Sequence, residues 1–192
     1  VYRGAFSAPV DEGTVASFLV NNLQPADCYA LAKLYAEMKH RAATWARIVD
    51  IRVFSFFSRH IDPHAGFLLS DIVRCIRDKT VFVTGQGDLV RDYIHPEDLF
   101  RLVNAGIGKQ DVNAAVDAYS LEPVSKSALL DYYRSAWDLD IRMKDASIGV
   151  DASGKKDLYC SQYRKAQDLF GYQPKFTSLQ SVDAETGAIF NQ

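Results

Sequence analysis

The sequence is poor in cysteine, carries little net charge and has no long hydrophobic run, and each of these features excludes a class of protein. Its three cysteines, Cys28, Cys75 and Cys160, are too scattered for a disulfide framework or a Cys/His metal motif. A formal net charge of −2 gives no field that favours nucleic acid. No apolar stretch approaches the roughly 20 residues that cross a bilayer. We therefore expect a reduced, cytoplasmic protein that binds no nucleic acid, no membrane and no metal.

The composition is that of an ordinary soluble globular protein. Hydrophobic residues make up 48% and charged residues 24% of the 192 positions, and both values are normal for such proteins. This length suggests one domain, or one domain and part of another. The chain starts at Val1 rather than at a methionine, which suggests a fragment or a processed chain.

The chain is organised around Tyr29 and Lys33. They fall in residues 27–43, which are expected to form a helix capped at its start by Asp27. Residues four apart lie only about 40° apart around a helix, so both side chains point the same way. An ammonium beside a phenol favours the phenolate, so Lys33 is expected to lower the pKa of Tyr29. The spacing alone fits an ordinary exposed pair as well. A separate stripe is expected to pack in the core, made of Leu31, Leu34, Tyr35 and Met38.

A buried strand and a polar loop follow this helix. Residues 47–54 are rich in apolar and β-branched side chains without clean alternation, which is typical of a parallel strand buried on both faces. Residues 55–65 then form a loop at the carboxyl end of the strand, where ligands bind in open α/β sheets. His60 and His64 lie in this loop, but no third His or Cys is placed to complete a metal site.

The remaining chain alternates between helices and strands. Helices are expected at residues 67–78, 96–107, 125–137, 161–170 and 178–190, and strands at residues 80–84, 89–94, 111–116 and 139–144. Ser161 is expected to cap the fourth of these helices. The buried side of the second helix is expected to consist of Leu99, Leu102, Val103 and Ile107. The glycines at positions 85 and 87 indicate a turn, because the further glycine and the lysine of a phosphate loop are absent.

Five short motifs occur in an order that is found in one enzyme family. They are residues 1–4 with 9–12, Tyr29 and Lys33 with Glu37, residues 52–55, residues 85–87 with 91–99, and residues 163–174. Together they resemble the extended short-chain dehydrogenases/reductases, and best the NAD-dependent sugar-nucleotide epimerase/dehydratase branch. The resemblance covers nearly the whole chain, and the Arg-Asp-Tyr-Ile-His-Pro-Glu-Asp run that starts at Arg91 is its most specific part.

The resemblance implies an α/β fold that consists of part of a Rossmann-type parallel sheet and a small α/β substrate-binding lobe. Residues 1–65 would form the C-terminal part of the NAD(P)-binding domain. Residues 66–192 would form mainly the substrate lobe, with a segment at about 89–116 returning to the first domain. The Gly-rich dinucleotide turn that opens the family's fold is absent from the sequence. The chain therefore resembles the C-terminal portion of such an enzyme.

The resemblance also implies roles for individual residues. The cofactor would be NAD or NADP. Tyr29 would act as general acid or base on a sugar hydroxyl or ketone, and Lys33 would hold the cofactor ribose. Phe54 and Ser55 would lie near the nicotinamide and the sugar, with Ser55 in the place of the family's usual Asn.

Further residues are implied for the substrate, which would be a nucleotide-activated sugar. Arg91 would bind its diphosphate, because a guanidinium suits phosphate oxygens; the alternative is a structural ion pair with a neighbouring acid. Lys155 and Asp157 occupy positions where the family places residues that hold the nucleotide. The family also implies a homodimer.

Two alternatives stay open from the sequence. One is an active epimerase, dehydratase or 4-keto reductase, three activities that share this scaffold. The other is a catalytically silent C-terminal fragment or interaction module that does not bind the cofactor.

Overall fold

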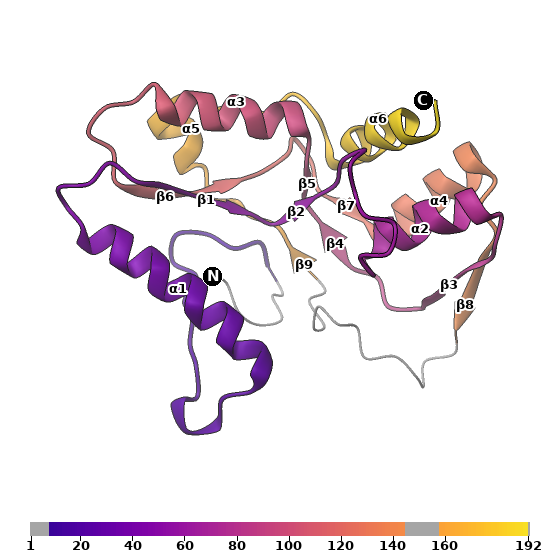
Figure 1. Cartoon of the computed structure of the whole chain (residues 1–192), viewed down its shortest axis with the longest axis horizontal. Coiled ribbons are helices and arrows are strands. Elements are labelled where there is room, and N and C mark those ends of the chain that lie inside the picture. The colour runs from indigo at the N-terminus through magenta and orange to yellow at the C-terminus, as the bar shows by residue number, and fades with distance from the viewer. Residues whose placement is uncertain (1–7, 145–157, 192) are drawn as a thin grey trace.

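The computed structural model describes residues 8–144 and 158–191, and their helices and strands form two groups (Figure 1). Helices α1, α3 and α5 surround the strands β1 and β6 in one group. Helices α2, α4 and α6 lie with β3 and β8 in the other. Short strands between the groups connect them.

The first group is built on one parallel strand pair. Strand β1 (Val49–Val53) pairs with β6 (Ala114–Ala118), in a register that runs from Val49 opposite Ala114 to Val53 opposite Ala118. All five residues of β6 are buried, as expected for a parallel strand covered on both faces. Helices α3 (Pro96–Ile107) and α5 (Lys165–Phe170) lie on one side of the pair, and α1 (Pro25–Ala42) lies on the other.

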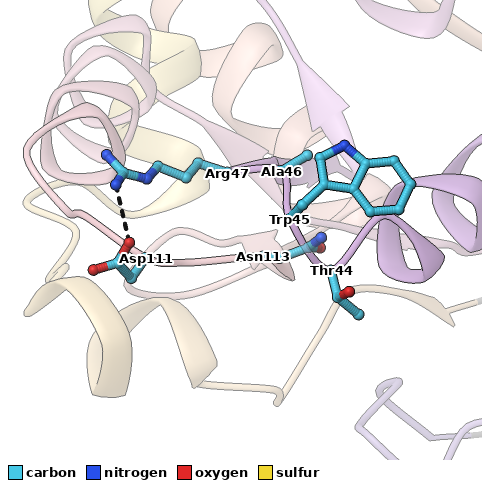
Figure 2. A pocket seen from close by; sticks show the side chains of 6 residues that line it. All are labelled: Thr44, Trp45, Ala46, Arg47, Asp111 and Asn113. Atoms are coloured by element: carbon cyan, nitrogen blue, oxygen red, sulfur yellow. Dashed lines mark ion pairs between the residues drawn. The ribbon is translucent and has the colours of Figure 1, made fainter.

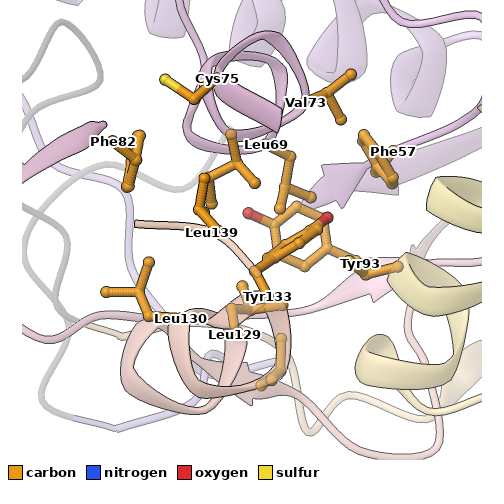
Figure 3. Close-up of a cluster of buried hydrophobic side chains, with 13 residues drawn as sticks. Phe57, Leu69, Val73, Cys75, Phe82, Tyr93, Leu129, Leu130, Tyr133 and Leu139 are labelled. Atoms are coloured by element: carbon orange, nitrogen blue, oxygen red, sulfur yellow. The ribbon is translucent and has the colours of Figure 1, made fainter. Parts of the chain in front are cut away.

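The second group contains the larger apolar core. Strand β3 (Phe82–Gly85) pairs in parallel with β8 (Ile141–Lys144) beside α2 (Leu68–Asp78), α4 (Lys126–Trp137) and α6 (Ser178–Phe190). Figure 3 shows side chains from α2, β3 and α4 gathered in this core around Tyr133 and Leu129, which are both fully buried. The Tyr133 hydroxyl is hydrogen-bonded to Thr186 Oγ1 at 2.9 Å, so the one polar group of this ring has a partner inside the core.

The structure also contains short strands and one turn of 3-10 helix. Strand β2 (Ser55–Phe56) pairs in parallel with β5 (Tyr93–Ile94). Strand β4 (Val90–Arg91) lies between antiparallel β7 (Val124–Ser125) and parallel β9 (Leu158–Tyr159). The 3-10 turn η1 spans Val20–Asn22. This mixed α/β architecture with parallel strand pairs confirms the fold class expected from the sequence.

Two expectations about α1 are wrong. The helix begins at Pro25, and Asp27 is its third residue instead of its cap. The Asp27 carboxylate accepts the backbone N–H of Gln24 at 2.9 Å, so the acid closes the first turn from inside the helix. The expected core stripe is not buried either, since Tyr35 is 64% and Met38 61% exposed. Among the α1 side chains whose burial is described, Asp27 is the only buried one.

Two other helices also differ from expectation for physical reasons. In α3, Leu102 is buried, but Val103 and Ile107 are exposed. The buried side of α3 includes Asp98, because its carboxylate accepts the backbone N–H groups of residues 175 and 176, and an apolar pattern does not reveal a buried acid. Helix α5 starts at Lys165, and Ser161 does not cap it.

Candidate functional site

Tyr29 and Lys33 lie next to each other on the exposed side of α1. Tyr29 is 72% exposed, and the Lys33 Nζ lies 5.5 Å from the centroid of its ring. Proline at the first helical position and the hydrogen bond from the Gln24 N–H to Asp27 fix the start of the helix, and therefore the direction in which both residues point. The structure thus places a phenol and an ammonium side by side on one accessible surface, as the spacing predicts.

Ion pairs attach α1 to β1. The Arg52 guanidinium on β1 pairs with the Glu37 carboxylate on α1, with Nε donating to Oε2 at 2.9 Å. Asp50 on β1 accepts Arg41 Nη2 at 2.7 Å and is hydrogen-bonded to His40 Nδ1 at 2.8 Å. Three α1 side chains within about one helical turn, Glu37, His40 and Arg41, are therefore engaged with Asp50 and Arg52 on β1.

A buried carboxylate extends this network across the parallel strands. Asp117 on β6 is fully buried, and its Oδ1 accepts Arg52 Nη1 at 3.3 Å. Its Oδ2 accepts the Ser161 hydroxyl at 2.5 Å. A buried charge is tolerated when it is paired and hydrogen-bonded. Asp117 thus ties α1 and β1 to the segment that follows β9.

Phe54 directly follows β1, at its carboxyl end. Its side chain is only 8% exposed and packs with Val10 and Tyr159, with 4.8 Å between the Phe54 and Tyr159 ring centroids. The next residue, Ser55, is half-buried and pairs with Tyr93 in the β2–β5 ladder. The chain therefore passes from the first group to the connecting strands at these two residues.

Arg91 lies on β4, directly opposite Tyr159 in the β4–β9 ladder. Its guanidinium carbon lies 5.8 Å from the centroid of the Tyr159 ring. One guanidinium nitrogen, Nη1, donates to the carbonyl of Val90 at 2.9 Å. The expected alternative partners are engaged elsewhere: Asp92 accepts Ser120 N, and Glu97 pairs with Lys175.

Tyr159 is the residue that sequence reasoning missed. It contacts Phe54 and faces Arg91, two residues that are 37 positions apart in the chain. Burial raises the pKa of its phenol, the Arg91 charge lowers it, and the Tyr29 phenol raises it further. Tyr29 therefore lies within electrostatic range of Tyr159. Tyr159 therefore contacts Phe54, faces Arg91 and lies within electrostatic range of Tyr29, three residues singled out from the sequence.

The two remaining candidates, Lys155 and Asp157, lie outside the described residues. The same is true of the segment 1–4 in the first motif.

A shallow hollow of about 190 Å³ lies elsewhere, between the α1–β1 turn and the start of β6 (Figure 2). Trp45 at its rim is 86% exposed, and Arg47 pairs across it with Asp111 at 3.1 Å. This hollow faces the amino ends of the two parallel strands. Because ligands bind at the carboxyl ends of such strands, the Tyr29–Tyr159 region is the better candidate site.

Two negative findings hold for residues 8–144 and 158–191. None of the helices there has the length and apolar character needed to cross a membrane. No group of three or more His, Cys, Asp or Glu side chains in these ranges is arranged to hold a metal ion.

The sequence profile described as "NAD dependent epimerase/dehydratase family" matches residues 6–121. The matched range is more than half of the 192 residues and contains Tyr29, Lys33, Phe54, Ser55 and Arg91. No curated protein matches the sequence.

Solved structures of sugar-nucleotide enzymes share the fold. The UDP-glucuronic acid 4-epimerase from Bacillus cereus, solved with UDP-glucuronic acid and NAD, superposes with a TM-score of 0.77 at 16% identity, over 99% of this chain and 59% of that one. The dTDP-glucose 4,6-dehydratase from Bacillus anthracis, solved with NAD, gives 0.74 at 16% identity, over 95% and 57%. DesIV from Streptomyces venezuelae, another such dehydratase, gives 0.74 at 17% identity, over 97% and 56%. The chain thus spans less than three fifths of the length of each.

Proposed function

The chain belongs to the NAD-dependent epimerase/dehydratase family, and we propose that it contributes the acid–base residue and the sugar-binding residues of an NAD-dependent enzyme acting on a nucleotide-activated sugar. The observation that carries the proposal is the position of Tyr159, which contacts Phe54, faces Arg91 and lies within electrostatic range of Tyr29. A phenol, an apolar surface and a guanidinium are the groups that such a substrate and cofactor require.

Tyr29 is proposed to exchange a proton with a hydroxyl or ketone oxygen on the sugar. Its exposure leaves the phenol accessible to a ligand, and the Lys33 ammonium lies beside its ring at 5.5 Å from the centroid. Lys33 is further proposed to hold the cofactor ribose, and Phe54 to pack near the nicotinamide. The cofactor, when bound, supplies the hydride acceptor and donor for the sugar carbon. The structural relatives bind NAD, which favours NAD over NADP here.

Arg91 is proposed to bind the substrate diphosphate, because a guanidinium offers several N–H donors to phosphate oxygens. Ser55 is proposed to contact the sugar beside it. The expected roles of Lys155 and Asp157 at the nucleotide remain proposals that rest on the family resemblance. So does the division into a cofactor-binding part at 1–65 and a mainly substrate-binding part at 66–192.

A homodimer through α1 and the preceding segment is also proposed, in a cytoplasmic protein. Large apolar side chains are exposed there, namely Val15, Leu19, Val20, Tyr35 and Met38. An apolar surface of this kind is typical of an interaction site. Light scattering after size exclusion tests the dimer, and a mass of one chain contradicts it.

A second candidate function is a substrate-binding or interaction module without catalysis. It is supported by the span of the chain, which covers 56–59% of its structural relatives, and by the lack of a Gly-rich pyrophosphate turn in the sequence. A helix N-terminus next to such a turn supplies much of the pyrophosphate binding in dinucleotide folds.

Titration of the chain with NAD+, NADH, UDP-glucose and dTDP-glucose separates the two candidates. Saturable binding of both cofactor and nucleotide sugar, with conversion of the sugar detected by chromatography, is the expected result. Binding of nucleotide sugar without cofactor or conversion supports the module. Absence of binding to either class contradicts both the enzyme and the substrate-binding module, and leaves only the interaction module.

A further inference from the structure

Lys126 is a buried lysine at the first position of α4. Its side chain is only 6% exposed, although lysine is rarely buried without a partner. The first turn of a helix is also an unfavourable place for a positive charge, because the backbone N–H groups at this end carry partial positive charge. Burial and helix position both oppose a lysine here, so specific acceptors must stabilise its ammonium.

The acceptors are carbonyl groups of the turn that joins β3 to β4. The Lys126 Nζ donates to the carbonyl of Gly85 at 2.6 Å and to that of Gly87 at 3.1 Å. The backbone N–H of Lys126 donates to the carbonyl of Leu89 at 2.7 Å. One residue of α4 therefore binds three carbonyls within residues 85–89, and two of these three hydrogen bonds need the ammonium.

The next residue of α4 holds the same turn by a second set of contacts. The Asp88 carboxylate accepts the backbone N–H of Ser127 and the Ser127 hydroxyl, both at 3.0 Å. A carboxylate beside the first turn of a helix is electrostatically favourable. Residues 85–89 are thus attached to the start of α4 by an ammonium from the helix and by a carboxylate from the turn.

The turn leads directly to Arg91. Strand β4 begins at Val90, one residue after the segment that Lys126 holds, and consists of Val90 and Arg91 alone. Val90 pairs with Ser125, the residue that precedes Lys126, and Arg91 pairs with Val124. Because so short a strand has few ladder contacts of its own, the attachment of the preceding turn to α4 contributes to the position of Arg91.

We propose that Lys126 is a positioning residue for Arg91: its ammonium fixes residues 85–89 on α4, and thereby holds the Arg91 guanidinium where it binds the diphosphate of a nucleotide sugar. The inference rests on the proposed function, because it takes the diphosphate site from it. Lys126 acts through the turn and through Arg91, with its own ammonium engaged by the carbonyls of Gly85 and Gly87.

The test compares Lys126→Met with the parent chain by calorimetric titration with UDP and with uridine. Methionine keeps much of the apolar stem and removes the two hydrogen bonds of the ammonium. The Kd of UDP is expected to rise about 3- to 10-fold, because a displaced guanidinium keeps only part of its charge-assisted hydrogen bonds. The Kd of uridine, which has no phosphate, should not change. In turnover of UDP-glucose, KM should rise while kcat stays constant.

The decisive comparison repeats the substitution in an Arg91→Ala background. If Lys126 acts through Arg91, Lys126→Met adds no further rise in the Kd of UDP once the guanidinium is absent. Additive effects of the two substitutions, or a Kd of UDP in Lys126→Met equal to that of the parent, overturn the inference alone. Unchanged binding of UDP by Arg91→Ala, or no binding of UDP by the parent, overturns the proposed diphosphate site as well.

Asp88→Ala provides a second variant that leaves the buried lysine in place. It removes the exposed carboxylate that attaches the turn to Ser127, and a smaller rise in the Kd of UDP is expected, again absent in the Arg91→Ala background. If Lys126→Met does not fold, an unchanged Kd of UDP in Asp88→Ala overturns the inference. Lys175→Met is the control, because it removes an ammonium that pairs with Glu97, and it should bind UDP like the parent.

Discussion

The Lys39 ammonium lies 5.5 Å from the centroid of the Tyr35 ring, and this pair reproduces the geometry of Tyr29 and Lys33 on the same helix. The Lys33 ammonium keeps the same 5.5 Å from its tyrosine ring, and Tyr35 is 64% exposed against 72% for Tyr29. Spacing and exposure therefore do not separate the two pairs. Proximity to Tyr159 does, because the Tyr29 phenol acts on the pKa of Tyr159. The chain thus contains its own matched control for the acid–base assignment.

Tyr29→Phe is expected to lower kcat for nucleotide-sugar conversion by about 10²–10⁴-fold, since it removes the group that exchanges a proton with the substrate. Binding of the nucleotide sugar should change little, because the ring is retained. Turnover is measured by product chromatography. Tyr35→Phe should leave kcat unchanged, and equal effects of the two substitutions would contradict the assignment of Tyr29.

Lys33→Met is expected to raise the Kd of NAD+ by about 10- to 150-fold, because charge-assisted hydrogen bonds contribute roughly 1.5–3 kcal/mol. Methionine preserves much of the apolar stem while removing the ammonium. Cofactor binding is measured by titration calorimetry. Lys39→Met serves as the control. A similar rise in the Kd of NAD+ in both variants would show that the effect comes from the total charge of α1 and not from Lys33 itself.

Arg91→Ala is expected to raise KM for the nucleotide sugar by about 10- to 100-fold, with a smaller change in kcat, because the diphosphate is bound in the ground state and in the transition state alike. Steady-state kinetics measure both constants. Arg134→Ala removes an exposed arginine that pairs only locally with Asp131 and should have no effect. A KM for Arg91→Ala equal to that of the parent would return Arg91 to a structural role.

Stability is expected to fall in acid through Glu185, which is 2% exposed and accepts three N–H groups of Arg59. Hydrogen bonds from Arg59 hold the pKa of Glu185 below its ordinary value of 4.5. A carboxyl whose pKa is lower in the folded protein stabilises it above the unfolded value, and the contribution is lost as the pH falls through the folded pKa.

Thermal melts between about pH 7 and pH 3 check this expectation. The Glu185→Gln variant should melt at a lower temperature at pH 7 and should lose less stability on acidification below about pH 4.5. Parallel curves for the two proteins would mean that other carboxylates cause the acid sensitivity.

Local sequence signals predicted most helices because their causes are local. Phe67 and Ser125 directly precede helices that begin within a residue of their expected starts, and Gly171 ends α5 in the left-handed conformation, as expected of a glycine after a helix. The expected apolar stripe of α1 failed for a reason outside the segment. The side of α1 that faces β1 contacts the charged side chains of Asp50 and Arg52. Apolar spacing therefore did not identify this side of the helix.

The candidate site was only partly predictable for the same reason. Tyr29, Lys33 and Arg91 fall in motifs that a single sequence displays, whereas Tyr159 enters the site through strand register. Its pairing with Arg91 joins segments 68 residues apart, and no pattern around position 159 signals it. The burial of Asp117 was not predictable for the same reason. It is a single acid in an apolar strand, and its hydrogen-bond donors, Arg52 and Ser161, come from distant parts of the chain.

The ion pairs between α1 and β1 have a consequence for how the molecule opens. An element held by partly exposed charges has an opening free energy that depends on ionic strength, whereas apolar contacts are insensitive to such screening. Backbone amides of α1 are therefore expected to exchange with deuterium faster as salt is raised, while those of α2 and α4 hold their rates. Because Tyr29 lies on α1, the ionic strength of the solution is expected to affect the position of its phenol.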